Sequence, residues 1–401
     1  MKKNKKFIAL FLCAALCVLA LAGCGSSSST TSTTTNSDTS SGTSSDSASM
    51  ASDDTVYTFT VVNHDSINSM CELWVETLLG AISEESGGRL QFNYYAGGSM
   101  YGATETIDAV KDGAADICWF TNGSYGGVFP ISEFVNVVGT VNSAQMASAV
   151  LNTAVEEIPE AAAEFANWHV LVLHGTSTSP LSTVGTKIET PDDLKGLSIR
   201  AAGTTPTLYL NTIGCTAISM PTSDVYDALS KKTLDGMAND WHNIDCFNLY
   251  EPIDYCMDVV LNATASGLLM NTDRWNELPE DLQEIFNKYC SSYFAADMAG
   301  YWWDSCRYWV GDEMLENGVE IYEPSDEVYD YMFSDEVLNT VHESYISYLN
   351  GYGYDGQAIW DQLCEIADRY EADYAGVWDA EFNYADWDMS TVDGYQAVYG
   401  G

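Results

Sequence analysis

Strand and helix patterns alternate along two long stretches of this chain, which limits the folds it can adopt. The strand patterns of the first stretch cover residues 56–62, 90–95 and 116–120. Helical spacing fills the intervals, and Gly87 and Gly88 end the first helical segment. Strands that alternate with helices pair in parallel through right-handed crossovers. The stretch therefore predicts an α/β lobe that binds ligands at the carboxyl ends of its strands.

The same alternation restarts in a second stretch, over residues 181–258. A further strand pattern at 266–270 is expected to return to the first lobe, so that the chain crosses between lobes more than once and forms a hinge. Pro279 opens a helical region that is expected to reach about residue 317. The predicted fold is α/β with two lobes: 55–175 as the first lobe, 176–262 as the second, and 263–371 as the return with hinge-spanning and C-terminal helices.

Arg200 is placed to bind an anion. It ends the predicted strand 197–200, and Gly203 and Pro206 follow it at the start of another predicted helix. A guanidinium beside the free N–H groups of a helix N-terminus makes a site for a carboxylate or phosphate. The chain has only five arginines, and Arg274 is the one rival for this role. The alternative is a structural ion pair between Arg200 and one of the many acidic residues.

The N-terminus has the pattern of a bacterial lipoprotein signal. Lys2, Lys3, Lys5 and Lys6 precede an apolar segment, residues 7–21, that is shorter than a typical transmembrane span. Small residues then precede Cys24, which predicts cleavage after residue 23 and a lipid anchor on Cys24. An ordinary secretion signal with an incidental cysteine is the alternative.

The segments that flank the predicted lobes have distinct compositions. Residues 24–54 are rich in serine and threonine, cannot bury a core and are expected to form a disordered tether. Residues 372–401 form an acidic, aromatic tail that we expect to dock on the folded body. The body between them is long enough for two domains with their own cores.

The formal net charge of −43 excludes two classes of partner. Nucleic acids and anionic lipid surfaces both require clustered lysine and arginine. A small anion is still permitted, because surface charges more than about 10 Å away are screened at ordinary ionic strength. Eight cysteines lie beyond Cys24, but none forms a C-x-x-C pair, so both disulfides and free thiols remain open.

Five segments resemble, in the right order, the solute-binding proteins of tripartite ATP-independent periplasmic (TRAP) transporters, the DctP type. Residues 190–200 resemble the family's "TPxDLKGLKIR" signature. The other four are 213–221, similar to "lGA-pv-mp"; 223–229, similar to "sEvYtAL"; 234–239, similar to "vDGqeN"; and 271–279, similar to "N-xxx-W-xx-LP". The resemblance implies a periplasmic-binding-protein-like fold, with a long hinge-spanning helix near Pro279.

The resemblance also implies roles for residues of the cleft. Arg200 falls on the arginine that pairs with the substrate carboxylate, and Asn239 on an asparagine that bonds the same ligand. Asp240 and Trp241 follow at the same cleft edge. The predicted strand ends of the first lobe add four candidates, namely Asn63, His64, Trp119 and Asn122.

One departure from the family pattern concerns ligand charge. Many members carry a second arginine shortly after the glycine that corresponds to Gly175, whereas residues 176–179 here are Thr-Ser-Thr-Ser. A monocarboxylate with a polar or aromatic remainder is therefore expected in place of a dicarboxylate. Trp119, Tyr125 and Trp241 could form an aromatic wall or could be core residues.

The expected function is an extracytoplasmic, lipid-anchored receptor that closes on a small organic acid and delivers it to a TRAP permease. No cofactor, metal or catalytic step is expected. The alternatives are a ligand-sensing surface lipoprotein and a hydrolase or lyase, although no enzyme motif is present. His169 and His174 point to opposite faces of their predicted strand, which argues against a metal pair. His242 is interpreted as a helix-capping residue, and His64 as the one histidine with a functional role.

Overall fold

The computed structural model describes residues 55–67, 69–290 and 300–374, and all structural statements below refer to these ranges. The predicted signal segment, Cys24, the tether and the C-terminal tail lie outside them, apart from the last helix, which continues to Tyr374. None of the described helices combines the length and the apolar content needed to cross a membrane.

The first sheet has five strands, and most of them lie where the sequence predicts. In the order in which they pair, its strands are β2 (Leu90–Tyr95), β1 (Tyr57–Val62), β3 (Ile117–Thr121), β10 (Ala265–Met270) and β4 (His169–Gly175). β1 pairs in parallel with β2 and β3, while β10 runs antiparallel between β3 and β4. The chain thus returns to this sheet after a long excursion.

The second sheet has six strands. In pairing order they are β11 (Glu320–Tyr322), β9 (Tyr255–Met257), β5 (Leu181–Thr183), β8 (Gly236–Ala238), β6 (Ser198–Ala201) and β7 (Thr216–Ser219). β6 is parallel to β7 and β8, whereas β5 is antiparallel to its neighbours β8 and β9. With the first sheet, this gives a mixed α/β fold organised around two sheets.

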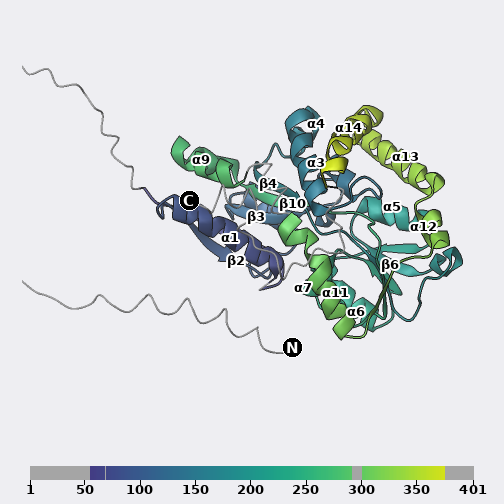
Figure 1. Cartoon of the computed structure of the whole chain (residues 1–401). Coiled ribbons are helices and arrows are strands. Elements are labelled where there is room, and N and C mark those ends of the chain that lie inside the picture. Colours follow the sequence, from purple (N-terminus) through teal and green to yellow (C-terminus); the bar gives the residue numbers. More distant parts are fainter. Residues whose placement is uncertain (1–54, 68, 291–299, 375–401) are drawn as a thin grey trace, which may run out of the picture. The chain divides into compact units, whose positions relative to one another are not determined.

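Helices cover both sheets. α1 (Met70–Glu85), α2 (Thr106–Lys111) and α3 (Ala144–Glu157) lie on the first sheet, α4 (Pro159–Glu164) packs on α3, and α9 (Glu280–Tyr289) packs on α1. α8 (Thr272–Asn276) follows β10, and its Trp275 stacks on His169 of β4. With the second sheet are associated α5 (Thr204–Thr212), α6 (Val225–Ser230), α7 (Trp241–Cys246), α11 (Cys306–Glu316) and α12 (Asp326–Met332). The last two helices, α13 (Asp335–Gly351) and α14 (Gly356–Tyr374), pack against α5 and α3 respectively (Figure 1).

One predicted helical region differs from the structure, and one break between helices has a local cause. α3 and α4 are separate helices because Ile158 is extended before Pro159 and proline disfavours a helical residue in front of it. The predicted helical region 279–317 contains α9, a π-helical turn at Gly300–Asp304 and α11. α9 packs on α1 and α11 on α7, so this region leads from the first sheet to the second.

The π-helical turn supplies two buried anchors between the sheets. Trp303 stacks on Trp119 and on His174, with ring centroids 6.2 Å and 4.8 Å apart. Asp304 accepts hydrogen bonds from the backbone N–H groups of Ala144 at 2.7 Å and Gln145 at 3.1 Å, at the N-terminus of α3. Because the carboxyl group is buried, the pKa of Asp304 is raised to about 7.

We expect Asp304 to make the protein less stable as pH rises. The folded-state pKa of about 7 lies above the ordinary value of 3.8, so the stabilising contribution is complete below pH 4 and is lost by about pH 7. Asp304→Asn should reduce the difference in unfolding free energy between pH 5 and pH 8 by about 2–3 kcal/mol. Urea unfolding at both pH values measures this, and an unchanged difference would contradict it.

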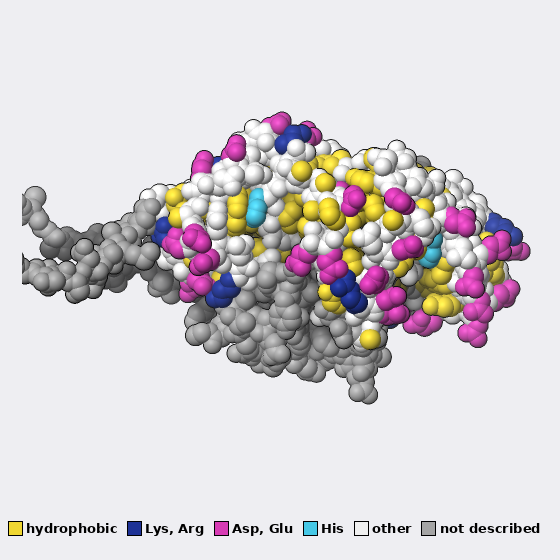
Figure 2. Space-filling view, turned by 90° about the horizontal axis from the view of Figure 1, so that it is seen from above, with side chains coloured by type: hydrophobic (Ala, Val, Ile, Leu, Met, Phe, Trp, Pro, Cys, Tyr) yellow, Lys and Arg dark blue, Asp and Glu magenta, His cyan; other side chains and the backbone are white. Residues whose placement is uncertain are grey.

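The surface is strongly acidic, and nearly all lysine and arginine side chains of the described residues form ion pairs with aspartate or glutamate. Figure 2 shows aspartate and glutamate side chains spread over one face with few lysines or arginines among them. Of the fifteen Lys and Arg of the chain, four precede the described residues, which leaves eleven. Nine of these eleven form ion pairs with carboxylates. Among the described residues, the exceptions are the exposed Lys232 and the buried Arg200.

Candidate functional site

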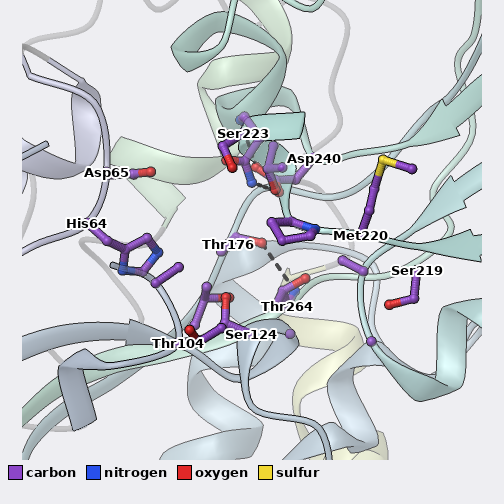
Figure 3. Close-up of a pocket in the computed structure, with 18 of the residues that line it drawn as sticks. His64, Asp65, Thr104, Ser124, Thr176, Ser219, Met220, Ser223, Asp240 and Thr264 are labelled. Atoms are coloured by element: carbon purple, nitrogen blue, oxygen red, sulfur yellow. Dashed lines mark hydrogen bonds between the residues drawn. The ribbon is translucent and has the colours of Figure 1, made fainter. Parts of the chain in front are cut away.

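A cavity of about 690 Å³ lies where the carboxyl ends of strands from both sheets meet. The first sheet contributes residues that follow β1, β2, β3 and β4, and the second contributes residues at the ends of β6, β7 and β8. In Figure 3, His64 and Thr104 face Ser219 and Met220 from opposite sides of the cavity. This volume is typical of small-molecule sites, and the position is the one predicted from the strand order.

Arg200 is the only lysine or arginine among the residues that line the cavity, and it is 4% exposed. Its Nε and Nη2 donate to the carbonyl oxygen of Met220 at 3.2 Å, and Nη2 also donates to Thr222 Oγ1 at 2.9 Å. Nη1 donates to Asn239 Oδ1. Since a guanidinium has five N–H groups, these bonds hold it in place and leave one N–H of Nη1 without an acceptor among the described residues.

The electrostatic state of Arg200 differs from that of every other arginine that the structure describes. The other four form ion pairs, whereas no described carboxylate forms one with Arg200. Burial lowers the pKa of Arg200 to about 10, so the group keeps its charge at neutral pH without the hydration that normally stabilises it. The structural ion pair that was the alternative interpretation of Arg200 is therefore absent from the described residues.

The backbone around Arg200 has the predicted form. β6 ends at Ala201, and α5 begins at Thr204 after Gly203, whose φ of 89° is readily adopted only by glycine. The first turn of α5 places Thr204 and Thr207 in the cavity wall. Free N–H groups of a helix N-terminus therefore lie on the same cavity as the guanidinium, an arrangement that favours an anion.

His64 and Trp119 line the cavity from the first sheet, as predicted. Their ring centroids are 5.0 Å apart, and Trp119 Nε1 donates to His174 Nε2 at 3.0 Å. His64 Nδ1 is buried without a hydrogen-bond partner among the described residues, and burial lowers the pKa of this histidine. A neutral imidazole with an unused nitrogen is available to a polar group of a ligand.

Asp240 also lines the cavity and is a structural cap. It is the N-cap residue of α7, where its Oδ1 accepts from the backbone N–H of Asn243 at 3.0 Å and from Ser177 Oγ at 3.4 Å. Burial raises the pKa of this carboxyl group. Its main role in the structure is thus to orient α7 at the cavity edge.

Four predicted site residues do not line this cavity. Asn239 lies behind Arg200 and positions its guanidinium, while Trp241 is buried in the core. Asn63 donates to the hydroxyl oxygen of Tyr94 at 2.8 Å, and Asn122 is buried, with its Oδ1 accepting from Asn136. Successive side chains at a strand end point in opposite directions. A position at the end of a strand was therefore not enough to predict which side chains reach the cavity.

Sequence reasoning missed Asp65 and His242, which both line the cavity. His242 Nε2 lies 2.7 Å from Asp65 Oδ2, so the interpretation of His242 as a helix cap is wrong, since Asp240 holds that position. Hydroxyl groups were missed as well. Thr104, Ser124, Thr176, Ser219, Thr222 and Thr264 all line the cavity. The sequence did offer one signal for His242, because it lies two residues after Asp240, the N-cap of α7.

The eight cysteines of the described residues form no disulfide. Most are buried, in agreement with their positions inside apolar runs. Of the two alternatives that the sequence left open, the structure therefore has free thiols.

Two sheets on either side of a cavity that contains a buried cation are the arrangement of two-lobe solute-binding proteins. The family model described as bacterial extracellular solute-binding protein, family 7 (DctP), matches residues 63–347. The chain belongs to this family, whose members are the extracytoplasmic receptors of TRAP transporters.

Solved structures of TRAP solute-binding proteins share the fold. One from a marine metagenome, described as specific for aromatic acid ligands and bound to 3-hydroxybenzoate, has a TM-score of 0.74 and 22% identity, with 79% of this chain and 99% of that chain covered. One from Rhodoferax ferrireducens with copurified benzoate has a TM-score of 0.73 and 23% identity over 79% and 99% of the two chains. A third, from Chromohalobacter salexigens with bound D-glucuronate, has a TM-score of 0.67 and 18% identity over 77% and 99%.

Curated relatives are distant in sequence. A solute-binding protein of Chromohalobacter salexigens is 23% identical over 63% of this chain and 75% of its own length. A monocarboxylate 2-oxoacid-binding periplasmic protein of Nostoc sp. is 25% identical over 53% of this chain and 59% of its own length.

Proposed function

We propose that this protein captures a small monocarboxylate in the cavity and delivers it to the membrane subunits of a TRAP permease. The observation that carries the proposal is the buried guanidinium of Arg200, which lines the cavity and forms no ion pair with a carboxylate among the described residues. A carboxylate ligand would restore the missing counter-charge and accept charge-assisted hydrogen bonds.

The number of positive charges supports a single carboxylate. Arg200 is the one lysine or arginine in the cavity wall. Residues 176–179, Thr-Ser-Thr-Ser, stand where the family resemblance leads us to expect a second arginine, and Thr176 lines the cavity. A second carboxylate would enter a buried region that also contains Asp65 and Asp240, and repulsion between like charges would oppose it. A dicarboxylate is therefore disfavoured.

The rest of the wall fits an aromatic or hydroxylated remainder. Trp119, His64 and Phe247 offer ring surfaces, while serine and threonine hydroxyls supply hydrogen bonds. Related structures bind 3-hydroxybenzoate, mandelate, D-glucuronate and pyroglutamate, which are monocarboxylates with ring or hydroxyl groups. These ligands belong to those proteins, and they indicate the chemical range to test here.

Delivery requires closure of the two lobes and attachment near the permease. Ligand contacts from both sheets would favour the closed state, which is how a ligand shifts a hinge equilibrium. Lipidation of Cys24 would hold the receptor at the cell membrane through the predicted tether. Binding and release involve no chemical step and no cofactor.

A thermal-shift screen against small organic acids tests the proposal. Benzoate, 3-hydroxybenzoate, mandelate, pyroglutamate and a 2-oxo acid represent monocarboxylates, with matched dicarboxylates and neutral amides as controls. At a concentration 100 times Kd, a ligand should raise the unfolding free energy by about 2.7 kcal/mol. We expect this from at least one monocarboxylate and not from its amide. A preference for dicarboxylates, or stabilisation by amide and acid alike, would contradict the proposal.

A further inference from the structure

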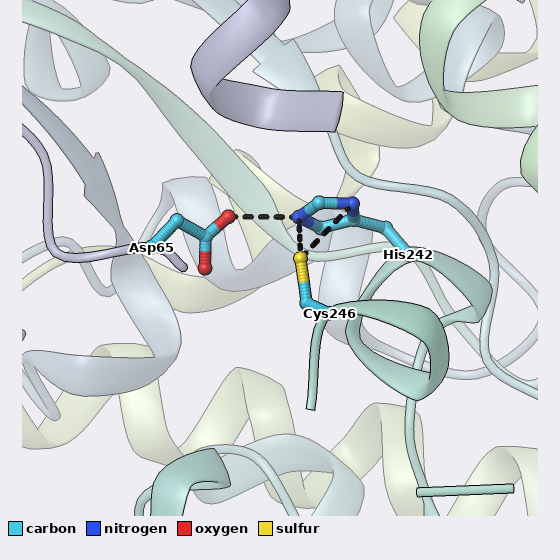
Figure 4. Close-up of side chains that lie close together, drawn as sticks. All are labelled: Asp65, His242 and Cys246. Carbon is cyan, nitrogen blue, oxygen red and sulfur yellow. Dashed lines mark hydrogen bonds and ion pairs between the residues drawn. The ribbon is translucent and has the colours of Figure 1, made fainter. Parts of the chain in front are cut away.

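Three side chains with metal-ligating atoms, Asp65, His242 and Cys246, lie close together beside the cavity, and Asp65 and His242 line it. Asp65 follows β1 on the first-sheet side, while His242 and Cys246 lie one turn apart on α7 (Figure 4). His242 Nε2 is 2.7 Å from Asp65 Oδ2 and 3.3 Å from Cys246 Sγ. All three donor atoms lie within 4.8 Å of one another. Residues four apart share a helix face, which explains why the imidazole and thiol meet.

The charge around this cluster favours a cation. Asp65 and Asp240 are buried to 2% and 4% exposure, and no described lysine or arginine forms an ion pair with either. Both side chains line the cavity, and so does His242. Asp65 is paired with the imidazole of His242 at 2.7 Å, so a cation that replaced the proton between them would lie beside two buried carboxylates, at a place that an ion can reach through the cavity.

We propose that Asp65, His242 and Cys246 form a Zn²⁺ site. A carboxylate oxygen, an imidazole nitrogen and a thiolate sulfur are the three donor types that Zn²⁺ takes in proteins, at about 2.0–2.3 Å. Small movements of these side chains would admit the ion. The proton between His242 Nε2 and Asp65 Oδ2 and the thiol proton of Cys246 would both be released to solvent on binding. The fourth coordination position would face the cavity, where water or a ligand oxygen can occupy it.

Such an ion would join the two sides of the cleft. Asp65 belongs to the first-sheet side and α7 to the second-sheet side, and Ser66 Oγ already donates to the carbonyl oxygen of Cys246 at 3.2 Å. The site is built from residues other than Arg200 and stands independently of carboxylate binding. The alternative is a plain Asp65–His242 ion pair with the thiol of Cys246 as a neighbour.

Isothermal titration with Zn²⁺ and absorption spectroscopy with Co²⁺ distinguish these possibilities. We expect the purified, chelator-treated full chain to bind one Zn²⁺ and to show a thiolate-to-cobalt charge-transfer band in the near ultraviolet. Cys246→Ser should lower Zn²⁺ affinity at least about 100-fold, since even outer-shell changes cost 10–100-fold, and should remove the band. Cys364→Ser, which changes a half-buried thiol on α14, is the matched control and should behave as the wild type.

Two results would overturn the site: no uptake of Zn²⁺ by the wild type, or equal affinity and equal spectra for Cys246→Ser and the control. If Cys246→Ser does not fold, as judged by circular dichroism, Asp65→Asn replaces it with the same expected loss of affinity. Failure of Zn²⁺ binding would leave the monocarboxylate proposal intact, because the acid screen is performed without metal.

Discussion

Replacing Arg200 by alanine should weaken carboxylate binding by several hundred-fold or more. Removing one partner of a buried, hydrogen-bonded charge pair costs about 2–5 kcal/mol, which corresponds to roughly 30- to 4,000-fold in Kd. The upper half of this range is expected, since Arg200 is the only lysine or arginine of the cavity wall and is 4% exposed. Isothermal titration with the best acid of the thermal-shift screen measures the effect.

The physical reason lies in how the guanidinium is held. Bonds to the Met220 carbonyl oxygen and to Thr222 and Asn239 fix its orientation before ligand arrives, so little entropy is lost on binding. Arg200→Lys keeps the charge but cannot reproduce the planar fork, and we expect it to recover only part of the affinity. This intermediate result would separate the contribution of charge from that of geometry.

Arg274→Ala is the matched control. Arg274 is paired with Asp116 at 2.9 Å and with Glu277, and it does not line the cavity. Its loss should leave Kd unchanged while lowering stability slightly. Equal loss of binding in both variants would indicate a general folding defect, and unchanged binding in Arg200→Ala would remove the basis of the proposed function.

The sequence predicted the first sheet and the position of Arg200 at the cavity, for reasons that are local. Apolar alternation with glycine turns is a short-range signal, and it gave the parallel pairing of β1 with β2 and β3. Arg200 stood out because arginine is rare in this chain and because a strand end and a helix start flank it. Both inferences use residues that are close together in sequence.

Features that depend on distant residues were not predicted. Asp65 and His242 are 177 residues apart, so no local pattern connects them, although they meet at one wall of the cavity. Asn63 and Asn122 were assigned to the cleft from strand ends, but side-chain direction there depends on neighbours such as Tyr94 and Asn136. The π-helical turn at Gly300–Asp304 also had no recognisable signal and is fixed by packing between the sheets.

Trp303→Ala should be among the most destabilising single substitutions in the described residues, with a cost of about 3–5 kcal/mol in unfolding free energy. Trp303 is fully buried and stacks nearly parallel to Trp119, while its edge contacts His242 at a centroid distance of 4.7 Å. The substitution would open a void behind two residues of the cavity wall, so ligand affinity should fall together with stability. Urea unfolding followed by circular dichroism measures the loss of stability.

Trp303→Phe should cost much less than Trp303→Ala, and this comparison tests the cause. Trp303 Nε1 has no hydrogen-bond partner among the described residues, so the indole contributes packing and no described hydrogen bond. Phenylalanine keeps most of the aromatic contact and removes a buried donor that is costly when unsatisfied. The half-buried Trp309 provides a control, and Trp309→Ala should lose less stability than Trp303→Ala. If Trp303→Phe were as damaging as Trp303→Ala, a hydrogen bond of the indole, and not its packing between the two sheets, would have to be the source of the stability.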